Sequence, residues 1–545
     1  THRFSKESPQ RVCAFCRWGD YPKPILQHKD DGGAEFHTSV TEDESSSPTR
    51  PPIAVCLTTD AVTCAVSEFE QREFESVVDS LHPGGLAPPL QDEKFFKDEE
   101  TNMLFGGAEA MQGHWGQLKK VLQDCNHVFV DRLEDLTGYH GGKTPDEELA
   151  KFHIPLKEPG LTHWERERKF SPAELAAIDE YVKELHEAGI IKKASRHVKF
   201  ATNLVVAAKR DSETGLWTSH RICQDLRGIN KISQTDFYKP PLLEELIMEV
   251  CQYKILGTMD LSKAFYQIKA TDEASEILTF WDGRGQLWSF TRLCFGAKNA
   301  SAHFQRVVEH TLRGLEKCAR AYIDDVVIFA NTPDEFVQAV KQVLQRLYSV
   351  GLRVHPTKSC FGAEALPYLG YLVGNNRLLP QEAKIKAIAE LPRPTDKTSL
   401  RSFLGVANYY RHMCGKPGLP HYSQVVKPLN ELLKESCKSV TDAWGPEQEE
   451  CFLEVKRRLC DPTNAVRPVD YNRPLLLYTD WSNAGIGAIL SQKDDEGQEY
   501  ICYAISRSLT SSESQYPSFY GEALALVYAV KTLRHVLHGV HFTVI

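Results

Sequence analysis

Apolar positions predict one well-defined amphipathic helix shortly after residue 170. They recur with helical spacing at Leu175, Ile178, Val182 and Leu185. Ser171 and Glu174 stand three positions apart, as in a capping box, and Pro172 between them suits the first helical position. Gly189 follows the last apolar position and is typical of a helix end. We therefore expect a helix between Ser171 and Gly189.

Further along the chain, strand-like apolar runs alternate with helical periodicity. The strand-like runs are rich in β-branched and aromatic residues and cover residues 203–210, 253–261 and 321–330. Helical stretches cover residues 297–315, 334–350 and 381–391. This alternation, without a visible internal repeat, predicts a mixed α/β or α+β class.

The first 150 residues have a different character. Acidic and Ser/Pro-rich patches at 42–52 and 91–100 separate short apolar segments, which predicts partial disorder. Cys13 and Cys16 have the spacing of a zinc-binding pair, but no histidine pair with finger spacing follows them. Surface or buried thiols are therefore the preferred interpretation of these cysteines.

A length of 545 residues favours three or four domains. The hydrophobic fraction of 42% and the charged fraction of 25% are ordinary for a soluble protein, and no apolar run approaches the ~18 residues of a membrane span. The sequence opens without an apolar leader, and its 15 cysteines follow no disulfide framework. We expect an intracellular protein with reduced thiols and no membrane partner.

The net charge of −9 is unevenly distributed. Residues 1–190 carry −15, residues 191–440 carry +11 and residues 441–545 carry −5. The basic surplus of the middle third suits a phosphate backbone, because basic side chains release its counterions on binding. Chance variation along a long chain explains the surplus equally well.

Two segments carry carboxylates at the ends of predicted strands. Asp324 and Asp325 stand between β-branched and aromatic residues, which predicts a β-hairpin with both aspartates in its turn. Asp260 lies 64 positions before Asp324, ends another strand and precedes a helix start. An acidic turn is usually structural, but three converging carboxylates repel one another unless cations bind among them. Two Mg²⁺ ions about 3.5–4 Å apart, or Mn²⁺ in their place, would activate a 3′-hydroxyl and neutralise a leaving pyrophosphate.

A series of motifs in fixed order gives the chain a resemblance to a known family. They read QDLRGINK at 224–231, MDLSKAFYQI at 259–268, FGAKNASAHFQR at 295–306, AYIDDVVIF at 321–329, LPYLGYLV at 366–373, LRSFLGVANYYR at 400–411 and LLLYTDWSNAGIGAILSQ at 475–492. From about residue 150 to the last residue, the chain resembles the reverse transcriptase and ribonuclease H portion of gypsy-class LTR retrotransposon polyproteins. The resemblance implies an α+β multidomain fold, with a right-hand polymerase of fingers, palm and thumb followed by a partial ribonuclease H-like α/β domain.

The resemblance assigns roles around the carboxylates. Asp260 and Asp324 are expected to bridge both metals, with Asp325 as the weaker neighbour and the Leu261 carbonyl as a further oxygen ligand. Phe265 lies where the family places an aromatic ring beneath the incoming sugar, and its bulk would exclude a 2′-hydroxyl. A core-packing aromatic is the alternative for Phe265.

The resemblance also implies a nucleotide site. Phe295 and Gly296 correspond to the loop that backs the nucleotide and the template base. Arg221 is assigned to the triphosphate, which suits the forked donors of a guanidinium, with Lys209 as a companion on the adjoining strand. Lys358 aligns with a lysine suspected of protonating pyrophosphate, although a solvated surface lysine is the commoner role.

The C-terminal block contains a second pair of carboxylates. Asp480 ends an apolar strand, and Glu522 lies in a strongly helical segment. The resemblance implies that this pair, with two further aspartates, holds metals that cleave RNA in a hybrid. The sequence stops about where the next strand should deliver the third carboxylate, and Trp481 replaces a usually small residue. We expect an incomplete centre without ribonuclease H activity in the chain as it stands.

Four regions are expected from these observations. They are an N-terminal extension or linker (1–150), fingers and palm (151–375), thumb and connection (376–465) and an incomplete ribonuclease H-like domain (466–545). The resemblance implies an RNA- and DNA-directed DNA polymerase that uses an RNA template, a DNA primer or RNA–DNA hybrid, and deoxynucleoside triphosphates. It leaves a homodimer or heterodimer open, and it implies a cytoplasmic location within virus-like particles, or a nuclear one.

A non-catalytic nucleic-acid-binding or scaffold subunit with the same fold is the alternative function. The missing ribonuclease H carboxylates favour it. The mutually repelling aspartates Asp260, Asp324 and Asp325 argue against it, because a binding subunit has no physical need for them.

Overall fold

The computed structural model describes residues 95–141, 147–195, 197–210 and 217–545. All of them belong to one compact unit, Leu57–Ile545. The expectations for Cys13, Cys16 and residues 42–52 lie outside the described residues. Within the described part of the chain, no helix combines the length and the apolar character that crossing a membrane requires.

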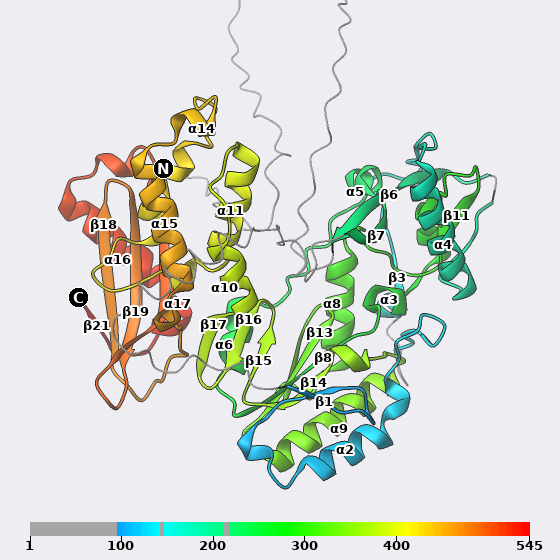
Figure 1. The fold of residues 1–545 in the computed structure, drawn as a ribbon, viewed down its shortest axis with the longest axis horizontal. Helices are drawn as coiled ribbons and strands as arrows, with labels where there is room; N and C mark the ends of the chain where they lie inside the picture. The colour runs from blue at the N-terminus through cyan, green and yellow to red at the C-terminus, as the bar shows by residue number, and fades with distance from the viewer. Residues whose placement is uncertain (1–94, 142–146, 196, 211–216) are drawn as a thin grey trace, which may run out of the picture. The chain divides into compact units, whose positions relative to one another are not determined.

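A six-stranded sheet, the palm sheet, carries the predicted carboxylates (Figure 1). Its strands, in spatial order, are β1 (Phe96–Lys97), β2 (Leu104–Phe105), β14 (Cys360–Ala363), β8 (Ile255–Asp260), β13 (Asp325–Ala330) and β12 (Ala319–Tyr322). Alternate residues of β13 are buried in two different cores. Val326 and Ile328 share one core with helices α8 (Ala300–Thr311) and α9 (Pro333–Ser349), whereas Val327 faces the other. Burial on both faces explains the continuous apolar run of this strand.

The first two strands of the palm sheet come from the segment that was expected to precede the polymerase. β2 pairs in parallel with β14, and Met103 and Phe105 are fully buried. Helix α2 (Trp115–Asp124) packs against α9. The expected boundary at residue 150 therefore does not follow the fold, because part of the segment before it completes the palm. Strands of two residues are too short to show a periodicity in the sequence. The acidic residues at 91–100 therefore led to a prediction of partial disorder there.

A second sheet corresponds to the expected fingers. Its strands are β4 (His163–Trp164), β6 (Phe200–Arg210), β10 (Thr279–Trp281), β11 (Leu287–Phe290) and β5 (Ile191–Lys193), with β7 (Trp217–Gln224) paired to β6. Helix α4 (Pro172–Glu187) contains the predicted amphipathic face. Its capping box is confirmed, since the Ser171 side chain accepts from the Glu174 N–H and the Glu174 side chain accepts from the Ser171 N–H.

The expected thumb follows a small three-stranded sheet. That sheet is made of β15 (Ala365–Tyr368), β16 (Tyr371–Gly374) and β17 (Arg377–Pro380). The main helices after it are α10 (Glu382–Ala389), α11 (Lys397–Tyr409), α12 (Tyr422–Val425), α13 (Lys427–Glu431) and α15 (Pro446–Cys460). Helix α6 (Leu243–Val250), from earlier in the chain, packs on β16. Apolar side chains of these helices share one core with the face of the palm sheet that carries Val327, which joins thumb and palm.

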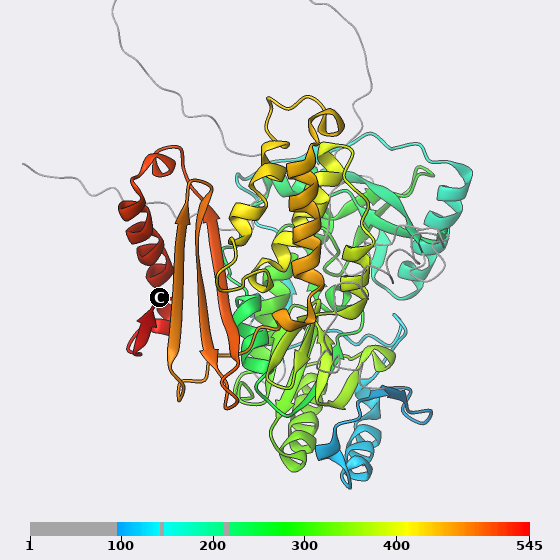
Figure 2. The same ribbon diagram turned by 60° about the vertical axis from the view of Figure 1, so that its left-hand side comes forward.

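The C-terminal residues form a sheet with a helix on one face (Figure 2). Its strands, in spatial order, are β20 (Glu499–Ser508), β19 (Gly485–Lys493), β18 (Leu475–Ser482) and β21 (Phe542–Val544). Helix α16 (Ser518–Thr532) packs on β18 and β19. The mixed α and β content and the separate sheets agree with the α+β multidomain class that the sequence predicts.

Candidate active site

Two strand ends bring the predicted carboxylates of the palm sheet together. Asp260 is the last residue of β8 and pairs directly with Asp325, the first residue of β13. Asp324 lies in the two-residue turn between β12 and β13, where Ile323 has a φ of 57°. The Leu261 N–H donates to the Asp324 carbonyl over 3.0 Å and ties the two segments together. The hairpin is confirmed, but its turn contains only Asp324, because Asp325 already belongs to the strand.

Burial raises the pKa of each of the three carboxyl groups. Asp260 adds to the rise at Asp324, and both neighbours add to the rise at Asp325, whose pKa reaches about 7. The Lys358 Nζ, 3.4 Å from the Asp260 Oδ2, opposes the rise at all three groups. His355 and Lys263 also oppose the rise at Asp260, but burial outweighs these charges, and the three carboxyl groups lack matching positive charge.

The donor chemistry of this strand end fits a hard divalent cation. Carboxylate and carbonyl oxygens are the ligands that Mg²⁺ prefers, and a bound cation would offset the burial and mutual repulsion that raise the pKa values of these carboxyl groups. Among the residues that the structure describes, no three His, Cys, Asp or Glu side chains are grouped to hold a metal ion. The three carboxyl groups nevertheless act on one another, since the charge of Asp260 raises the pKa of Asp324 and the charges of both raise the pKa of Asp325.

A buried glutamine that the sequence analysis did not single out holds the carboxylate turn. Gln305 lies on α8 and is fully buried. Its Nε2 donates to the Ala321 carbonyl over 3.0 Å, and its Oε1 accepts from the Ile323 N–H over 2.5 Å. Gln305 therefore acts as an extra strand partner for the turn that carries Asp324. The available signal was a polar residue within the FGAKNASAHFQR motif.

A second buried glutamine holds the loop after Asp260. The Gln267 Nε2 donates to the Ser262 carbonyl over 2.7 Å and to the Arg353 carbonyl over 2.9 Å. Its Oε1 accepts from the Arg353 N–H over 2.7 Å. These bonds satisfy a buried amide completely and fix the loop between Asp260 and Phe265.

The predicted aromatic residues of the nucleotide site meet in the structure. The Phe265 ring is half-buried, with its centroid 5.0 Å from that of Phe295 and 5.7 Å from that of Phe304. Phe295 is 41% exposed, so this aromatic pair borders solvent on one side. Gly296 has a φ of 91°, a conformation that favours glycine.

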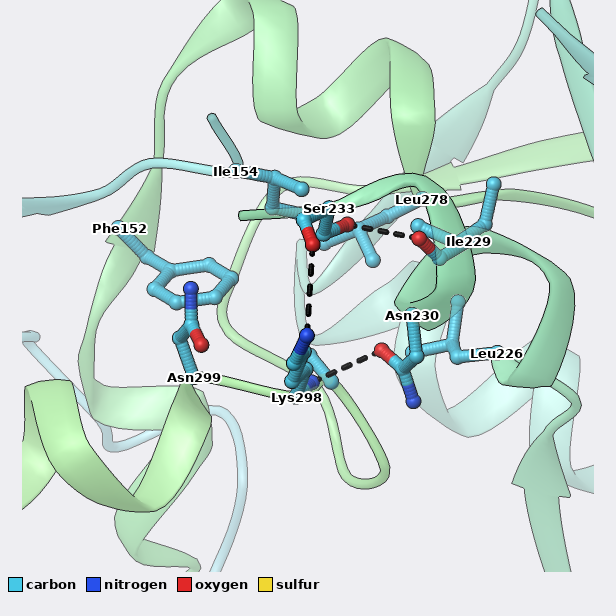
Figure 3. Close-up of a pocket in the computed structure, with 10 residues that line it drawn as sticks. Phe152, Ile154, Leu226, Ile229, Asn230, Ser233, Leu278, Lys298 and Asn299 are labelled. Carbon is cyan, nitrogen blue, oxygen red and sulfur yellow. Dashed lines mark hydrogen bonds between the residues drawn. The ribbon is translucent and has the colours of Figure 1, made fainter. Parts of the chain in front are cut away.

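The loop after Gly296 is tied to helix α5 (Arg227–Ile232), as Figure 3 shows. The Asn230 amide donates to the Gly296 carbonyl and accepts from the Lys298 N–H, both over 2.9 Å. The cavity behind this loop has a volume of about 10 Å³, which is the size of one water molecule. It is therefore a packing gap under the loop and too small for a nucleotide.

The predicted triphosphate residues lie on the fingers sheet. Arg221 is exposed on β7, opposite Ala207 of β6. Lys209 belongs to β6, but its side chain lies outside the described part. The structure thus places both residues on neighbouring strands of a different sheet from Asp260, and it does not test their joint role.

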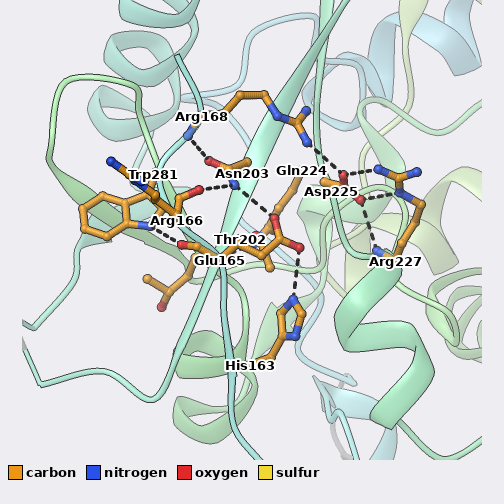
Figure 4. Close-up of polar contacts among 11 residues, drawn as sticks. His163, Glu165, Arg166, Arg168, Thr202, Asn203, Gln224, Asp225, Arg227 and Trp281 are labelled. Carbon is orange, nitrogen blue, oxygen red and sulfur yellow. Dashed lines mark hydrogen bonds and ion pairs between the residues drawn. The ribbon is translucent and has the colours of Figure 1, made fainter. Parts of the chain in front are cut away.

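A polar network not found from the sequence fixes the end of β7 (Figure 4). Asp225 is buried and accepts from Arg227 Nε over 2.8 Å and from Arg227 Nη2 over 2.6 Å. Arg168 Nη2 lies 3.6 Å from the same carboxylate. Hydrogen bonding to Arg227 is the main reason that the pKa of Asp225 is lowered. The network joins the segment before α4 to the strand that carries Arg221.

The predicted C-terminal carboxylates approach each other where α16 packs on β18. Asp480 lies on β18 and Glu522 on α16, and burial followed by the charge of Asp480 raises the pKa of Glu522. Two thumb residues also reach Asp480. Gln424 donates to its carboxylate over 3.1 Å, and the His421 Nε2 lies 3.9 Å away.

The unusual Trp481 has a compensating partner on α16. A Cβ on Gly521 would overlap the indole ring, so the helix approaches the ring only because this position is a glycine. The indole ring of Trp481 therefore occupies the space that a side chain at position 521 would take.

Two family models match this chain, one over the fingers and palm and the other over the C-terminal region. Residues 208–373 match the model of the family described as reverse transcriptase (RNA-dependent DNA polymerase). Residues 444–544 match the model described as an RNase H-like domain found in reverse transcriptase, so this match begins before the expected boundary at residue 466.

Curated relatives are transposon polyproteins. The retrovirus-related Pol polyprotein from transposon 297 of Drosophila melanogaster is 31% identical over 369 residues, which cover 67% of this chain and 33% of the relative. The Pol polyprotein from transposon gypsy of the same fly is 30% identical over 66% of this chain and 35% of the relative. The Tf2-3 polyprotein of Schizosaccharomyces pombe is 27% identical over 73% of this chain. The chain thus spans about a third of the length of these relatives.

Solved structures show the same fold. The foamy viral protease-reverse transcriptase in complex with RNA/DNA hybrid has a TM-score of 0.64 and 19% identity, and the match covers 85% of this chain and 58% of that protein. The same viral protein in its dRH form with double-stranded DNA has a TM-score of 0.64 and 20% identity, covering 86% and 77%.

Proposed function

Because the chain belongs to the reverse transcriptases of LTR retrotransposon Pol polyproteins, we propose that it is an RNA- and DNA-directed DNA polymerase. In this function it adds deoxynucleotides to the 3′ end of a primer paired with an RNA or DNA template. The observation that carries the proposal is the register of the palm sheet, which sets Asp260 opposite Asp325 and beside Asp324. No structural need accounts for three mutually repelling carboxylates at one strand end.

The carboxylates are the residues that would hold two Mg²⁺ or Mn²⁺ ions. Asp260 and Asp324 are the principal ligands, with Asp325 and the Leu261 carbonyl beside them. When bound, the ions supply Lewis acidity to the primer 3′-oxygen and the triphosphate. Gln305 and Gln267 keep the two ligand-bearing loops in place through buried hydrogen bonds.

Residues around the carboxylates orient the incoming nucleotide. Phe265 and Phe295 form an aromatic border next to Asp260, where a ribose ring would pack, and the bulk of Phe265 selects deoxyribose. The exposed Lys358 Nζ, held 3.4 Å from Asp260, can give a proton to the leaving pyrophosphate. Arg221, exposed on the fingers strand β7, would bind the triphosphate, with Lys209 of β6 as its companion.

Nucleic acid is the proposed partner of this surface. The surplus of +11 in residues 191–440 falls on fingers, palm and thumb, where a template–primer duplex lies over the carboxylates. The related viral structures, solved with RNA/DNA hybrid and with double-stranded DNA, support a duplex of either kind. Contacts of this sort recognise duplex shape and phosphate more than base sequence.

Primer extension on an RNA template with Mg²⁺ tests the proposal. Asp324→Asn should lower the rate of extension by about 10³-fold, because it removes a charge aimed at the reacting groups. Hybrid binding should stay near that of the wild type. The matched control is Asp272→Asn at the first residue of α7 (Asp272–Ile277), where the carboxylate is fully exposed, and its extension rate should not change.

The same experiment separates the proposal from a non-catalytic scaffold. A chain that binds the hybrid but adds no nucleotide with Mg²⁺ or Mn²⁺ would be a scaffold. An Asp324→Asn variant that extends within about tenfold of the wild type would refute the assignment of the metal ligands.

A further inference from the structure

Two neighbouring tyrosines at the end of the thumb helix α11 donate hydrogen bonds to a tight turn beside the carboxylates. The turn is Leu369–Gly370, which joins β15 to β16. The Tyr409 hydroxyl donates to the Leu369 carbonyl over 2.6 Å, and the Tyr410 hydroxyl donates to the Gly370 carbonyl over 2.9 Å. Both carbonyls of the turn are therefore held by one helix end.

The turn has a backbone conformation that needs such support. Leu369 has a φ of 47° and Gly370 a φ of 84°, as in a type I′ hairpin. Glycine adopts this conformation readily, but leucine does so only when its surroundings impose it. A side chain at position 370 would also press on this contact, since a Cβ there would lie 3.3 Å from the Tyr409 hydroxyl and 3.4 Å from the Tyr410 hydroxyl.

The same turn is adjacent to the proposed reaction centre. Tyr368, the residue before it, donates through its hydroxyl to the Asp325 carbonyl over 3.4 Å. β15 also packs on β8, the strand that ends at Asp260. If the carboxylates transfer nucleotides, the primer terminus must lie within a few ångströms of them, and therefore next to this turn.

We propose that Tyr409 and Tyr410 are positioning residues that set the β15–β16 turn against the terminal nucleotide of the primer. This inference rests on the proposed polymerase function. The tyrosines do not touch the reacting atoms; they act through the Leu369 and Gly370 carbonyls. Burial raises the pKa of Tyr409 to about 12, so its hydroxyl remains a donor throughout the working pH range. The thumb thereby fixes the turn as well as contacting the duplex.

The neighbouring Tyr371 provides a matched control. It is fully buried, and its ring centroid lies 5.3 Å from that of Tyr409 and 5.2 Å from that of Tyr410. Its hydroxyl donates to the Tyr409 carbonyl over 3.0 Å and not to the turn. Tyr371→Phe therefore removes a buried hydroxyl from the same cluster and keeps both hydroxyl groups that donate to the turn.

Single-turnover addition of one deoxynucleotide at saturating duplex and nucleotide tests the inference. The double variant Tyr409→Phe/Tyr410→Phe should add the nucleotide about tenfold more slowly, with the dissociation constant of the duplex within about threefold of the wild type. A 2-aminopurine at the primer 3′ end should become brighter, because its stacking loosens. Tyr409→Phe alone, at a position that is 36% exposed, should show the same change to a smaller extent.

Two results would overturn the inference while the polymerase function stands. In the first, the wild type extends primers, and the double variant shows the same rate of addition and the same 2-aminopurine fluorescence as the wild type. The other is Tyr371→Phe losing as much rate as the double variant, which would indicate packing of the cluster. A wild type that adds no nucleotide would instead refute the proposed function, and the positioning role with it.

Discussion

Shortening the Phe265 side chain should separate its role in sugar selection from a role in packing. In the structure the ring is half-buried and packs against Phe295 on its open side and Phe304 on its buried side. Phe265→Val loses two aromatic contacts of about 0.5–1.5 kcal/mol each and leaves part of the ring volume empty. We expect a loss of about 2 kcal/mol in the free energy of unfolding.

The catalytic effect should differ between the two sugars. A ribonucleotide places its 2′-hydroxyl against the ring and shifts its α-phosphate, and a shift of ~1 Å can cost ~100-fold in rate. Removing the ring should raise the ratio of ribonucleotide to deoxynucleotide addition at least about tenfold, which is about 1.4 kcal/mol. Deoxynucleotide addition should fall less, because Asp260 and Asp324 are unchanged.

The assay is single-nucleotide addition with both sugars, together with the melting temperature. Phe304→Leu is the control, because Phe304 is fully buried behind Phe265. This substitution should lower stability without changing the ratio of ribonucleotide to deoxynucleotide addition. An unchanged ratio in a destabilised Phe265→Val protein would show that the ring only packs, and the sugar-selection reasoning would be wrong.

Three further predictions concern stability. Phe105→Ala should lower the free energy of unfolding of the palm by about 3–5 kcal/mol, measured by urea denaturation, because this ring is fully buried in the palm sheet; a detached extension would lose almost nothing. Gly521→Ala should lower the melting temperature through overlap with Trp481, and adding Trp481→Ala should restore part of the loss. Hydrogen bonding to Arg507 lowers the pKa of Glu513 from 4.5 to about 2, so this pair stabilises the fold above about pH 4.5 and loses its effect as the pH falls toward 2. Arg507→Gln should lower the melting temperature at neutral pH and flatten its acid dependence; equal acid dependence in both proteins would contradict this.

Local sequence signals predicted the elements that local interactions determine. The capping box of α4 and the apolar face behind it lie within one stretch of chain. The Asp324 hairpin was predicted because its flanking residues are strong strand formers. The position of Asp325 was assigned one place too far into the turn, since the two-residue loop begins at Ile323 and only the register of the paired strands reveals it.

Features that depend on distant residues were not predicted. Gln305 and Gln267 bond to backbone atoms of other segments, and their sequence neighbours give no sign of those partners. The sequence showed Trp481 as a departure from the family, but only the fold shows that Gly521 lies opposite it. In each case the sequence contained the residue, but its partner was assigned only by the fold.

Leu104 and Cys360 pair in parallel across the palm sheet, so a ribosome completes one strand long before its partner. At about 5–20 residues per second, the ~250 residues between them take roughly 10–50 s to synthesise. During that time the apolar side chains of Met103 and Phe105 have no sheet to enter. The palm therefore becomes a complete folding unit only after β14 has left the ribosome.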